Sequence, residues 1–237
     1  SSDLWSVPGR VAYALEGIIV TCGATIVWLR DQLGLFARSS ETQEMALAVE
    51  DNGGVYLVPA FSGLGAPHWR MDLRAAVLGL TLGADKRHLA RAALESIPYQ
   101  IRDVMTVMEQ DSGVRLRQLR VDGGITANRF VMQFLADLLG VDVVNIGIPD
   151  VSALGAAFLA GLHEGVFRDI GQLERLSIGR QTHRPAARAG PWPAHRRCQT
   201  AAATGRARPR SAVSARRPAH CRPRSTRIRA RCWRRSH

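Results

Sequence analysis

The sequence predicts an α/β domain with helices packed on a mixed or parallel sheet. Three observations lead to this fold class. Strand-like and helix-like stretches alternate along most of residues 11–184. One long stretch repeats apolar residues at helical spacing. A pair of glycines also separates a strand-like run from a helix-like run.

The first predicted strand and the longest predicted helix lie in the first half of the chain. Val55–Val58 is a short apolar run closed by Pro59, which is typical of a buried strand. Asp85 is a suitable helix N-cap. Beyond it, apolar residues recur at spacings of three and four and mark one helix face: Leu89, Ala93, Ile97, Ile101, Val104 and Met108. Pro98 lies inside this stretch, so we expect a kink or a break there.

Further elements follow in the second half. A second helix is expected to carry Phe130, Phe134, Leu138 and their neighbours, and Gly140 is its natural stop. Residues 141–144 restart a strand. Ser152 is predicted to cap a helix of small residues, 153–157, whose small side chains also suit plain close packing of helices.

The strongest chemical feature is a strand, a glycine pair and a helix in succession. Leu119–Val121 reads as a strand and is followed by Asp122, Gly123 and Gly124. Glycines permit positive φ and let a ligand approach bare backbone. A helix start presents unpaired N–H groups to a phosphate, and the Asn128 amide can donate and accept hydrogen bonds there. By itself the pattern also fits a plain turn, because Asp-Gly-Gly is common in turns.

The net charge of +12 comes from one end of the chain. Residues 1–183 hold 16 Lys and Arg against 20 Asp and Glu, a net charge of −4. Residues 184–237 hold 16 Arg and no acidic residue, a net charge of +16. The body is therefore an ordinary, mildly acidic globular segment, and the basic pI does not describe it.

Two interpretations of the basic end remain open. Its arginines would bind nucleic acids non-specifically through phosphates, which makes a nucleic-acid-binding protein the competing function class. It lacks periodicity and zinc-ligand spacing, however, and its Arg, Ala and Pro mixture is typical of GC-rich DNA read out of frame. We expect residues 185–237 to be a frameshifted, disordered tail, because they offer few large apolar side chains.

Few sequence features point to a special compartment. No apolar run approaches the ~20 residues that a bilayer-spanning helix needs. The first residues do not resemble a signal peptide, and the absence of an initiator Met suggests a start inside a longer protein. Cys22 is the single cysteine of the body, which excludes a disulfide framework and favours a reducing cytoplasm.

Several blocks resemble the glycerol kinases of the FGGY carbohydrate-kinase family, in sequence and in order, over about residues 11–185. The most specific is Val58–Trp69, with the run Pro-Ala-Phe-Ser-Gly-Leu-Gly-Ala-Pro. The others are Tyr13–Gly17, Gly79–Thr81, Ala93–Ile97, Gln100–Val104, Asp111–Gly113, Leu119–Asn128 and Ala153–Ala157.

The resemblance implies a fold, a domain division and an activity. It implies a ribonuclease H/actin-like domain, the C-terminal half of a two-domain kinase that transfers the ATP γ-phosphate to glycerol. Residues 1–10 would be a remnant of an upstream region, 11–184 the nucleotide-binding domain, and 185–237 the tail. ATP or ADP with Mg²⁺ would bind between the two domains. Relatives are expected to be cytoplasmic homo-oligomers, and kinases of other sugars or polyols in the family are the alternative.

The same resemblance points to individual nucleotide-binding residues. Gly23, Gly124 and Asn128 match positions that contact the nucleotide, and Gly123 and Ala153–Gly155 are near neighbours. Val27 stands where the family usually has a glutamine that contacts the nucleotide. An apolar side chain cannot replace that hydrogen bond, so we expect weaker ADP binding.

No catalytic residue is assigned to this chain. In the family, the aspartate base and most glycerol contacts lie upstream of the matched region. The local carboxylates are predicted to be structural, with Asp122 the best catalytic candidate because it borders the glycine pair: Asp72, Asp103, Asp122 and Asp137. Half of a cleft cannot position both substrates. We therefore expect the chain alone to be inactive as a kinase. A further alternative is a degraded kinase that is kept as an interaction module.

Overall fold

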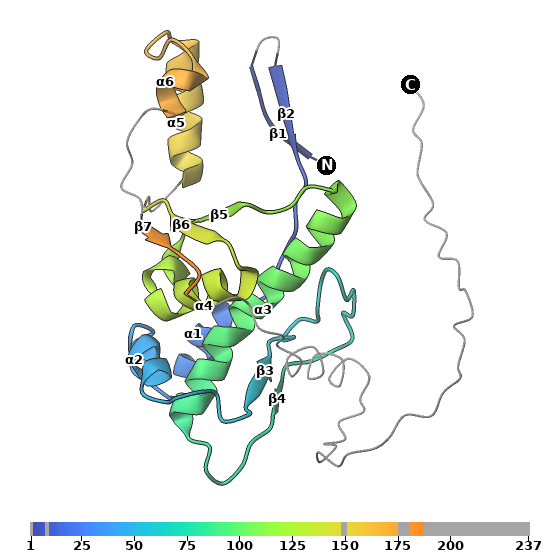
Figure 1. The fold of residues 1–237 in the computed structure, drawn as a ribbon, viewed down its shortest axis with the longest axis vertical. Coiled ribbons are helices and arrows are strands. Elements are labelled where there is room, and N and C mark those ends of the chain that lie inside the picture. The colour runs from blue at the N-terminus through green and yellow to red at the C-terminus, as the bar shows by residue number, and fades with distance from the viewer. Residues whose placement is uncertain (1, 8–9, 148–150, 175–180, 187–237) are drawn as a thin grey trace, which may run out of the picture. The chain divides into compact units, whose positions relative to one another are not determined.

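The computed structural model describes residues 2–7, 10–147, 151–174 and 181–186 (Figure 1). The predicted disorder of the tail lies outside these residues. The strands are β1 (Ser2–Val7), β2 (Arg10–Ala14), β3 (Tyr56–Val58), β4 (Ala76–Leu78), β5 (Gln118–Val121), β6 (Asp142–Asn145) and β7 (Gln181–His183). The helices are α1 (Ala24–Asp31), α2 (Glu41–Leu47), α3 (Lys86–Ser112), α4 (Arg129–Leu139), α5 (Val151–His163) and α6 (Ile170–Glu174), and η1 (Gly124–Ala127) is a 3₁₀ turn.

The strands form three small groups. β1 pairs with β2, and β3 pairs with β4, both antiparallel. β5 and β6 are parallel, with Leu119 opposite Val143, and β7 adds to β6 in the antiparallel direction. The β5-β6-β7 sheet is therefore mixed, as predicted, and helix α4 provides the crossover between its parallel strands.

Helix α3 is the central element of the described body (Figure 1). Asp85 is its N-cap, as predicted: its carboxylate accepts hydrogen bonds from the amides of Arg87 (2.9 Å) and His88 (3.4 Å). Of the kink or break predicted at Pro98, the break is wrong, because the helix runs without interruption from Lys86 to Ser112; the kink stays a prediction. Pro98 is fully buried, and the packing of this buried stretch outweighs the lost backbone hydrogen bond.

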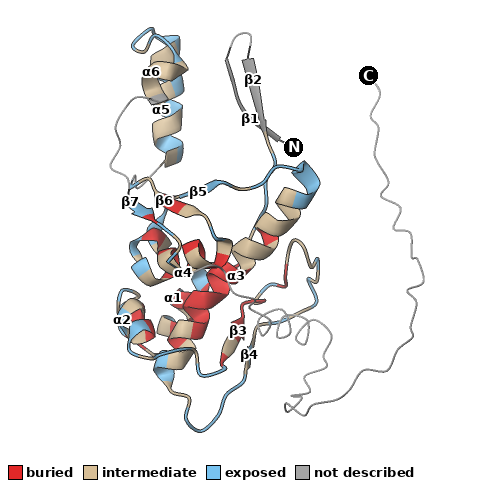
Figure 2. Ribbon diagram, viewed as in Figure 1, coloured by how far each residue is buried: buried red, intermediate tan, exposed pale blue. Residues whose placement is uncertain are grey.

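The main hydrophobic core surrounds the N-terminal half of α3. Figure 2 shows the buried residues along this half of the helix, with others on α1, β3 and α4. The core residues include Leu29 of α1, Leu57 of β3, Leu94 and Ile97 of α3, and Leu135 of α4. The predicted apolar face of α3 is thus the face that packs, through Ala93 and Ile97. On α4 the core residues are neighbours of the predicted ones: Val131, Met132, Leu135 and Ala136. Burial of this surface is the main stabilising contribution.

Of the two helix ends predicted in the second half of the chain, the structure confirms one and contradicts the other. Gly140 ends α4 in the left-handed conformation (φ 68°, ψ 25°), as predicted. Ser152 is not a cap, because α5 already begins at Val151. None of the residues of α5 is buried, and its Phe158 ring meets the Phe167 ring edge-to-face, with centroids 5.7 Å apart. Within the described part of the chain, every helix falls short of the length and apolar character needed to cross a membrane.

Candidate functional site

The first predicted contact residue, Gly23, stands at the N-terminus of α1. Its backbone is helical (φ −58°, ψ −24°), and its carbonyl accepts hydrogen bonds from the amides of Ile26 (3.0 Å) and Val27 (3.2 Å). No heavy atom lies within 4 Å of the point where a Cβ would stand. Val27 is one turn farther along and 43% exposed. A ligand at this end of α1 would meet bare backbone and then an apolar side chain.

The glycine pair leads from β5 into η1. Gly123 has φ 89° and ψ 173°, a conformation that only glycine adopts readily. Gly124 is the first residue of η1 and has no positive φ, so the conformational demand falls on Gly123 alone. Beside both glycines, the Cβ positions have no neighbour within 4 Å. Both residues are exposed, which leaves the backbone of this turn open to a ligand.

Asn128 connects η1 to α4. As the N-cap of α4, its Oδ1 accepts a hydrogen bond from the Val131 amide (3.2 Å). Its Nδ2 lies 3.4 Å from the hydroxyl of Thr42 on α2. Next to it, the Arg129 amide donates to Gln43 Oε1 (2.7 Å). Asn128 is half-buried and lies close in sequence to the glycine pair.

This arrangement corrects the expected helix start. The α-helix does not begin at the glycines, because the η1 turn intervenes and α4 starts only at Arg129. Its early amides are already occupied: Gln43 takes the Arg129 N–H, and Asn128 takes those of Val131 and Met132. The open backbone is therefore that of the glycine turn rather than that of the helix end. The contacts of Asn128 with α2 had no local sequence signal, because they join residues 86 positions apart.

The two predicted contact regions rest on one core. Cys22, next to Gly23, and Ile125, next to Gly124, both pack against the main hydrophobic cluster. Burial raises the pKa of the Cys22 thiol. Among the described residues, no hydrogen bond joins Gly23 or Val27 to the Gly123–Asn128 segment. The structure thus fixes each region against the same core without bonding one to the other.

The local carboxylates have structural partners in three cases of four. Asp72 pairs with Arg70 (2.7 Å), and hydrogen bonding to Arg70 lowers the pKa of Asp72 to about 2. Asp103 lies 3.6 Å from His68 and 3.6 Å from Arg102. Asp137 accepts hydrogen bonds from Gln133 (3.0 Å) and from the Ala186 amide (2.7 Å). Asp122 is exposed beside the glycine pair and stays the best local candidate.

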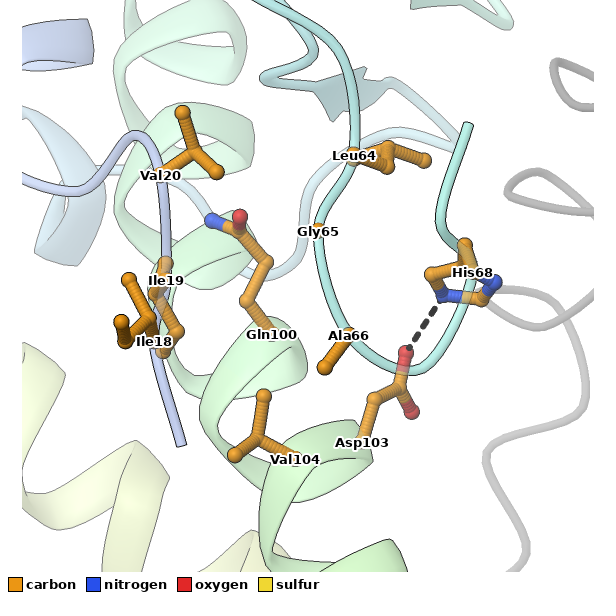
Figure 3. Close-up of a pocket in the computed structure, with 10 residues that line it drawn as sticks. All are labelled: Ile18, Ile19, Val20, Leu64, Gly65, Ala66, His68, Gln100, Asp103 and Val104. Atoms are coloured by element: carbon orange, nitrogen blue, oxygen red, sulfur yellow. Dashed lines mark ion pairs between the residues drawn. The ribbon is translucent and has the colours of Figure 1, made fainter. Parts of the chain in front are cut away.

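A small cavity lies away from the glycine turn. Ile18–Val20, the loop Leu64–His68 and α3 line it, with Gln100, Asp103 and Val104 on the helix (Figure 3). Its volume of about 20 Å³ has room for about one water molecule. A nucleotide or a polyol does not fit there. Among the described residues, no group of three His, Cys, Asp or Glu side chains could hold a metal ion.

A family model and curated relatives cover most of the body. Residues 4–163 match the C-terminal domain of the FGGY family of carbohydrate kinases. The glycerol kinase of Symbiobacterium thermophilum is 54% identical over 169 residues, which are 71% of this chain and 34% of that protein. The glycerol kinase of Burkholderia pseudomallei has the same identity and coverage. The chain therefore spans about a third of the length of these relatives.

Solved structures have the same fold. The glycerol kinase of Plasmodium falciparum, solved with ADP, is 31% identical, with a TM-score of 0.67 over 80% of this chain and 37% of that one. The gluconate kinase of Lactobacillus acidophilus is 21% identical, with a TM-score of 0.60 over 78% of this chain and 36% of that one. The second likeness concerns the fold alone.

Proposed function

Because the chain belongs to the FGGY family of carbohydrate kinases and carries its C-terminal domain, we propose that it is the nucleotide-binding part of a glycerol kinase. The complete enzyme would transfer the γ-phosphate of ATP to glycerol and give glycerol 3-phosphate. The observation that carries this substrate assignment is the 54% identity with glycerol kinases. The gluconate and xylulose kinases that have the same fold are only 21–23% identical to this chain, which favours glycerol over gluconate or xylulose as the substrate.

In this proposal, ATP or ADP lies against the open glycine positions. Gly23, Gly123 and Gly124 leave room where other residues would place a Cβ. Close approach to bare backbone suits a phosphate or a ribose. Asn128 would contribute its side-chain amide, beside its contacts with α4 and Thr42. Val27 would face the nucleotide without a hydrogen bond, so ADP binds more weakly than to a relative with glutamine there.

The chain contributes no base for the glycerol hydroxyl in this proposal. Three of the four local carboxylates already have cationic or amide partners, and Asp122 is exposed beside the glycine pair. Phosphoryl transfer requires the hydroxyl, its base and the γ-phosphate in one closed cleft. Mg²⁺ would accompany the ATP phosphates, but the described residues do not fit a protein-held metal, and we assign none of them to it.

The competing function is nucleic-acid binding through the arginines of residues 184–237. Their charge of +16 favours any polyanion. Such binding weakens steeply with salt, whereas binding at the glycine turn depends on particular residues. We place the complete enzyme in the cytoplasm, as a homo-oligomer, without a specific nucleic-acid partner.

Isothermal titration of the chain with ADP separates these functions. The titration is repeated at increasing salt concentration, which weakens binding to the arginine-rich end, so that the remaining heat reports the glycine turn. We expect saturable binding of one ADP, stronger in Val27→Gln because this variant supplies a donor and an acceptor. Binding of ADP that high salt abolishes and that Val27→Gln leaves unchanged would contradict the proposed site.

A further inference from the structure

The segment that leads into Gly23 has almost no backbone support. Residues 15–21 follow β2 but form no strand. Among the described residues, no backbone–backbone hydrogen bond reaches them. Their side chains offer little burial either: Ile18 is 66% exposed and Val20 is 46% exposed. The position of the Gly23 turn therefore depends on whatever holds this short segment.

Packing contacts constrain the segment from two sides without fixing the orientation of its peptide groups. A Cβ at position 17 would overlap the Val104 side chain of α3. A Cβ at position 65 would lie 3.3 Å from Val20 Cγ2. These contacts are apolar and lack the directionality of a hydrogen bond. They keep the segment close to α3 and to the loop that carries Gly65, but they do not orient the peptide groups before Gly23.

One polar contact orients these peptide groups. Gln100 Nε2 donates a hydrogen bond to the Thr21 carbonyl (3.0 Å) and lies 3.4 Å from the Ser96 carbonyl on its own helix. Figure 3 shows the Gln100 side chain directed from α3 toward the segment that carries Ile19 and Val20. Among the described residues, this is the single hydrogen bond to the backbone of residues 15–21.

The hydrogen bond acts close to the proposed nucleotide contact. Thr21 is buried and precedes Gly23 by two residues. The intervening Cys22 carbonyl accepts the Thr25 amide (3.1 Å), and the Gly23 carbonyl accepts those of Ile26 and Val27. Fixing the Thr21 carbonyl therefore fixes the peptide planes that begin α1. Gln100 stands on the rigid part of α3, directly after the buried run that ends at Tyr99.

We propose that Gln100 is a positioning residue for the nucleotide site: it holds the Gly23 turn in the binding conformation without touching the nucleotide. This inference rests on the proposed function, since it assigns a role to the turn that would contact ADP. It concerns a residue on a different element, 77 positions away from Gly23. A nucleotide that packs against the backbone of Gly23 needs that backbone in place before it binds.

The test compares two glutamines that make the same kind of bond. Gln100→Met keeps the length and helix propensity of the side chain but removes the donor. Gln133→Met is the control, because Gln133 Nε2 also donates to a backbone carbonyl, that of Arg184 (2.8 Å), away from the Gly23 turn. Both full-length variants are titrated with ADP at high salt concentration, which weakens binding to the arginine-rich end. Melting temperature and amide hydrogen exchange of residues 18–27 are measured beside the titration.

We expect Gln100→Met to weaken ADP binding by about two- to tenfold, the effect of one lost hydrogen bond. The amides of Thr25, Ile26 and Val27 should exchange faster in this variant alone. Gln133→Met should lower the melting temperature to a similar extent and leave both readouts unchanged. Gln100→Glu, which also lacks the donor at neutral pH, should repeat the result and serves if the methionine variant does not fold.

The outcomes separate the inference from the function it rests on. If the unchanged chain fails to bind ADP, the proposed function is wrong, and the exchange of residues 18–27 still decides the role of Gln100. If the chain binds ADP and Gln100→Met binds equally well, the positioning role is wrong. Equal exchange of these residues in Gln100→Met and the unchanged chain would also overturn it.

Discussion

Two adjacent glycines have different roles in the candidate site. Gly123 holds a backbone conformation with φ 89° that other residues adopt only with strain. Gly124 has no such requirement, but its missing Cβ leaves open space at the surface. The sequence presented both as one flexible pair. The structure divides them into a residue required for folding and a residue available for binding.

Single substitutions should separate these roles. Gly123→Ala is expected to lower the free energy of unfolding by about 1–3 kcal/mol, because it forces a side chain into a strained conformation. Gly124→Val is expected to change stability little and to weaken ADP binding, because its branched side chain fills the open space. Urea unfolding and ADP titration of both variants check this division. A large loss of stability in Gly124→Val, with ADP affinity intact, would reverse the assignment.

The sequence could predict part of this site at the residue scale. A strand, two glycines and a helix with asparagine at its start indicate an open turn, and the structure has that turn. The partners of Asn128 and Thr21 could not be predicted, because Thr42 and Gln100 reach them from distant parts of the chain. Local patterns contain no information about which side chain crosses between elements.

At the scale of elements, a buried polar network joins three helices. Arg91 of α3 pairs with Glu95 (2.9 Å) and donates to the carbonyls of Ala46 (3.1 Å) and Val49 (2.6 Å) at the end of α2. Its guanidinium also lies over the Phe130 ring of α4, at 5.1 Å. Burial raises the pKa of Glu95, while the hydrogen bond from Arg91 opposes that rise. The network fixes α2 and α4 on α3.

Removing the arginine should therefore be costly. Arg91→Met leaves a buried carboxylate without its cation, which is expected to lower the free energy of unfolding by about 3–5 kcal/mol at pH 7. The loss should be smaller at pH 5, because the folded state binds the proton on Glu95 more tightly than the unfolded chain does. Arg87→Met is the control, because its pair with Asp85 is exposed and is expected to change stability little. Equal effects of the two substitutions would show that the network is not stabilising.

The edge strand β7 provides a pH-dependent element. His183 pairs with Val143 across the sheet and is only 8% exposed. Burial, and then the charge of Arg129, lower the pKa of His183 below its usual value near 6.5. Protonation therefore favours the unfolded chain. Stability from this residue is complete above about pH 6.5 and is lost as the pH falls toward the lower pKa of the folded state.

Urea unfolding at pH 7.5 and pH 5.5 checks the His183 prediction. The unchanged chain should lose stability at the lower pH, and His183→Gln should lose less because it carries no titrating group. His183→Gln retaining the full pH dependence would assign that dependence to other groups.

The sequence predicted helices well where the helical repeat of apolar residues continued over several turns. The apolar face of α3, the cap at Asp85 and the stop at Gly140 all follow from local patterns. The break at Pro98 failed because burial on every side of the helix outweighs one missing hydrogen bond. α1, α2 and β7 were not predicted, because short elements depend on contacts with the core rather than on their own periodicity.

At the scale of the whole molecule, the chain exposes apolar surface that an isolated domain would bury. Leu15, Ile18 and Val20 line the unpaired segment before α1, and α5 is apolar with no buried residue. Surface of this kind is typical of a face that contacts another part of a protein. It agrees with a chain that spans about a third of the length of its glycerol kinase relatives. In the proposed function, this chain binds the nucleotide and the remaining two thirds of the enzyme hold the base for glycerol.

Mixing this chain with a separately expressed N-terminal portion of a glycerol kinase tests that division most directly. A coupled assay measures the ADP formed from ATP in the presence of glycerol, with xylulose and gluconate as alternative substrates. We expect background rates for each part alone and glycerol-dependent turnover in the mixture, because only the mixture brings the base, the hydroxyl and the γ-phosphate together. Turnover by this chain alone, abolished in Asp122→Asn, would place the base on this chain and contradict the account.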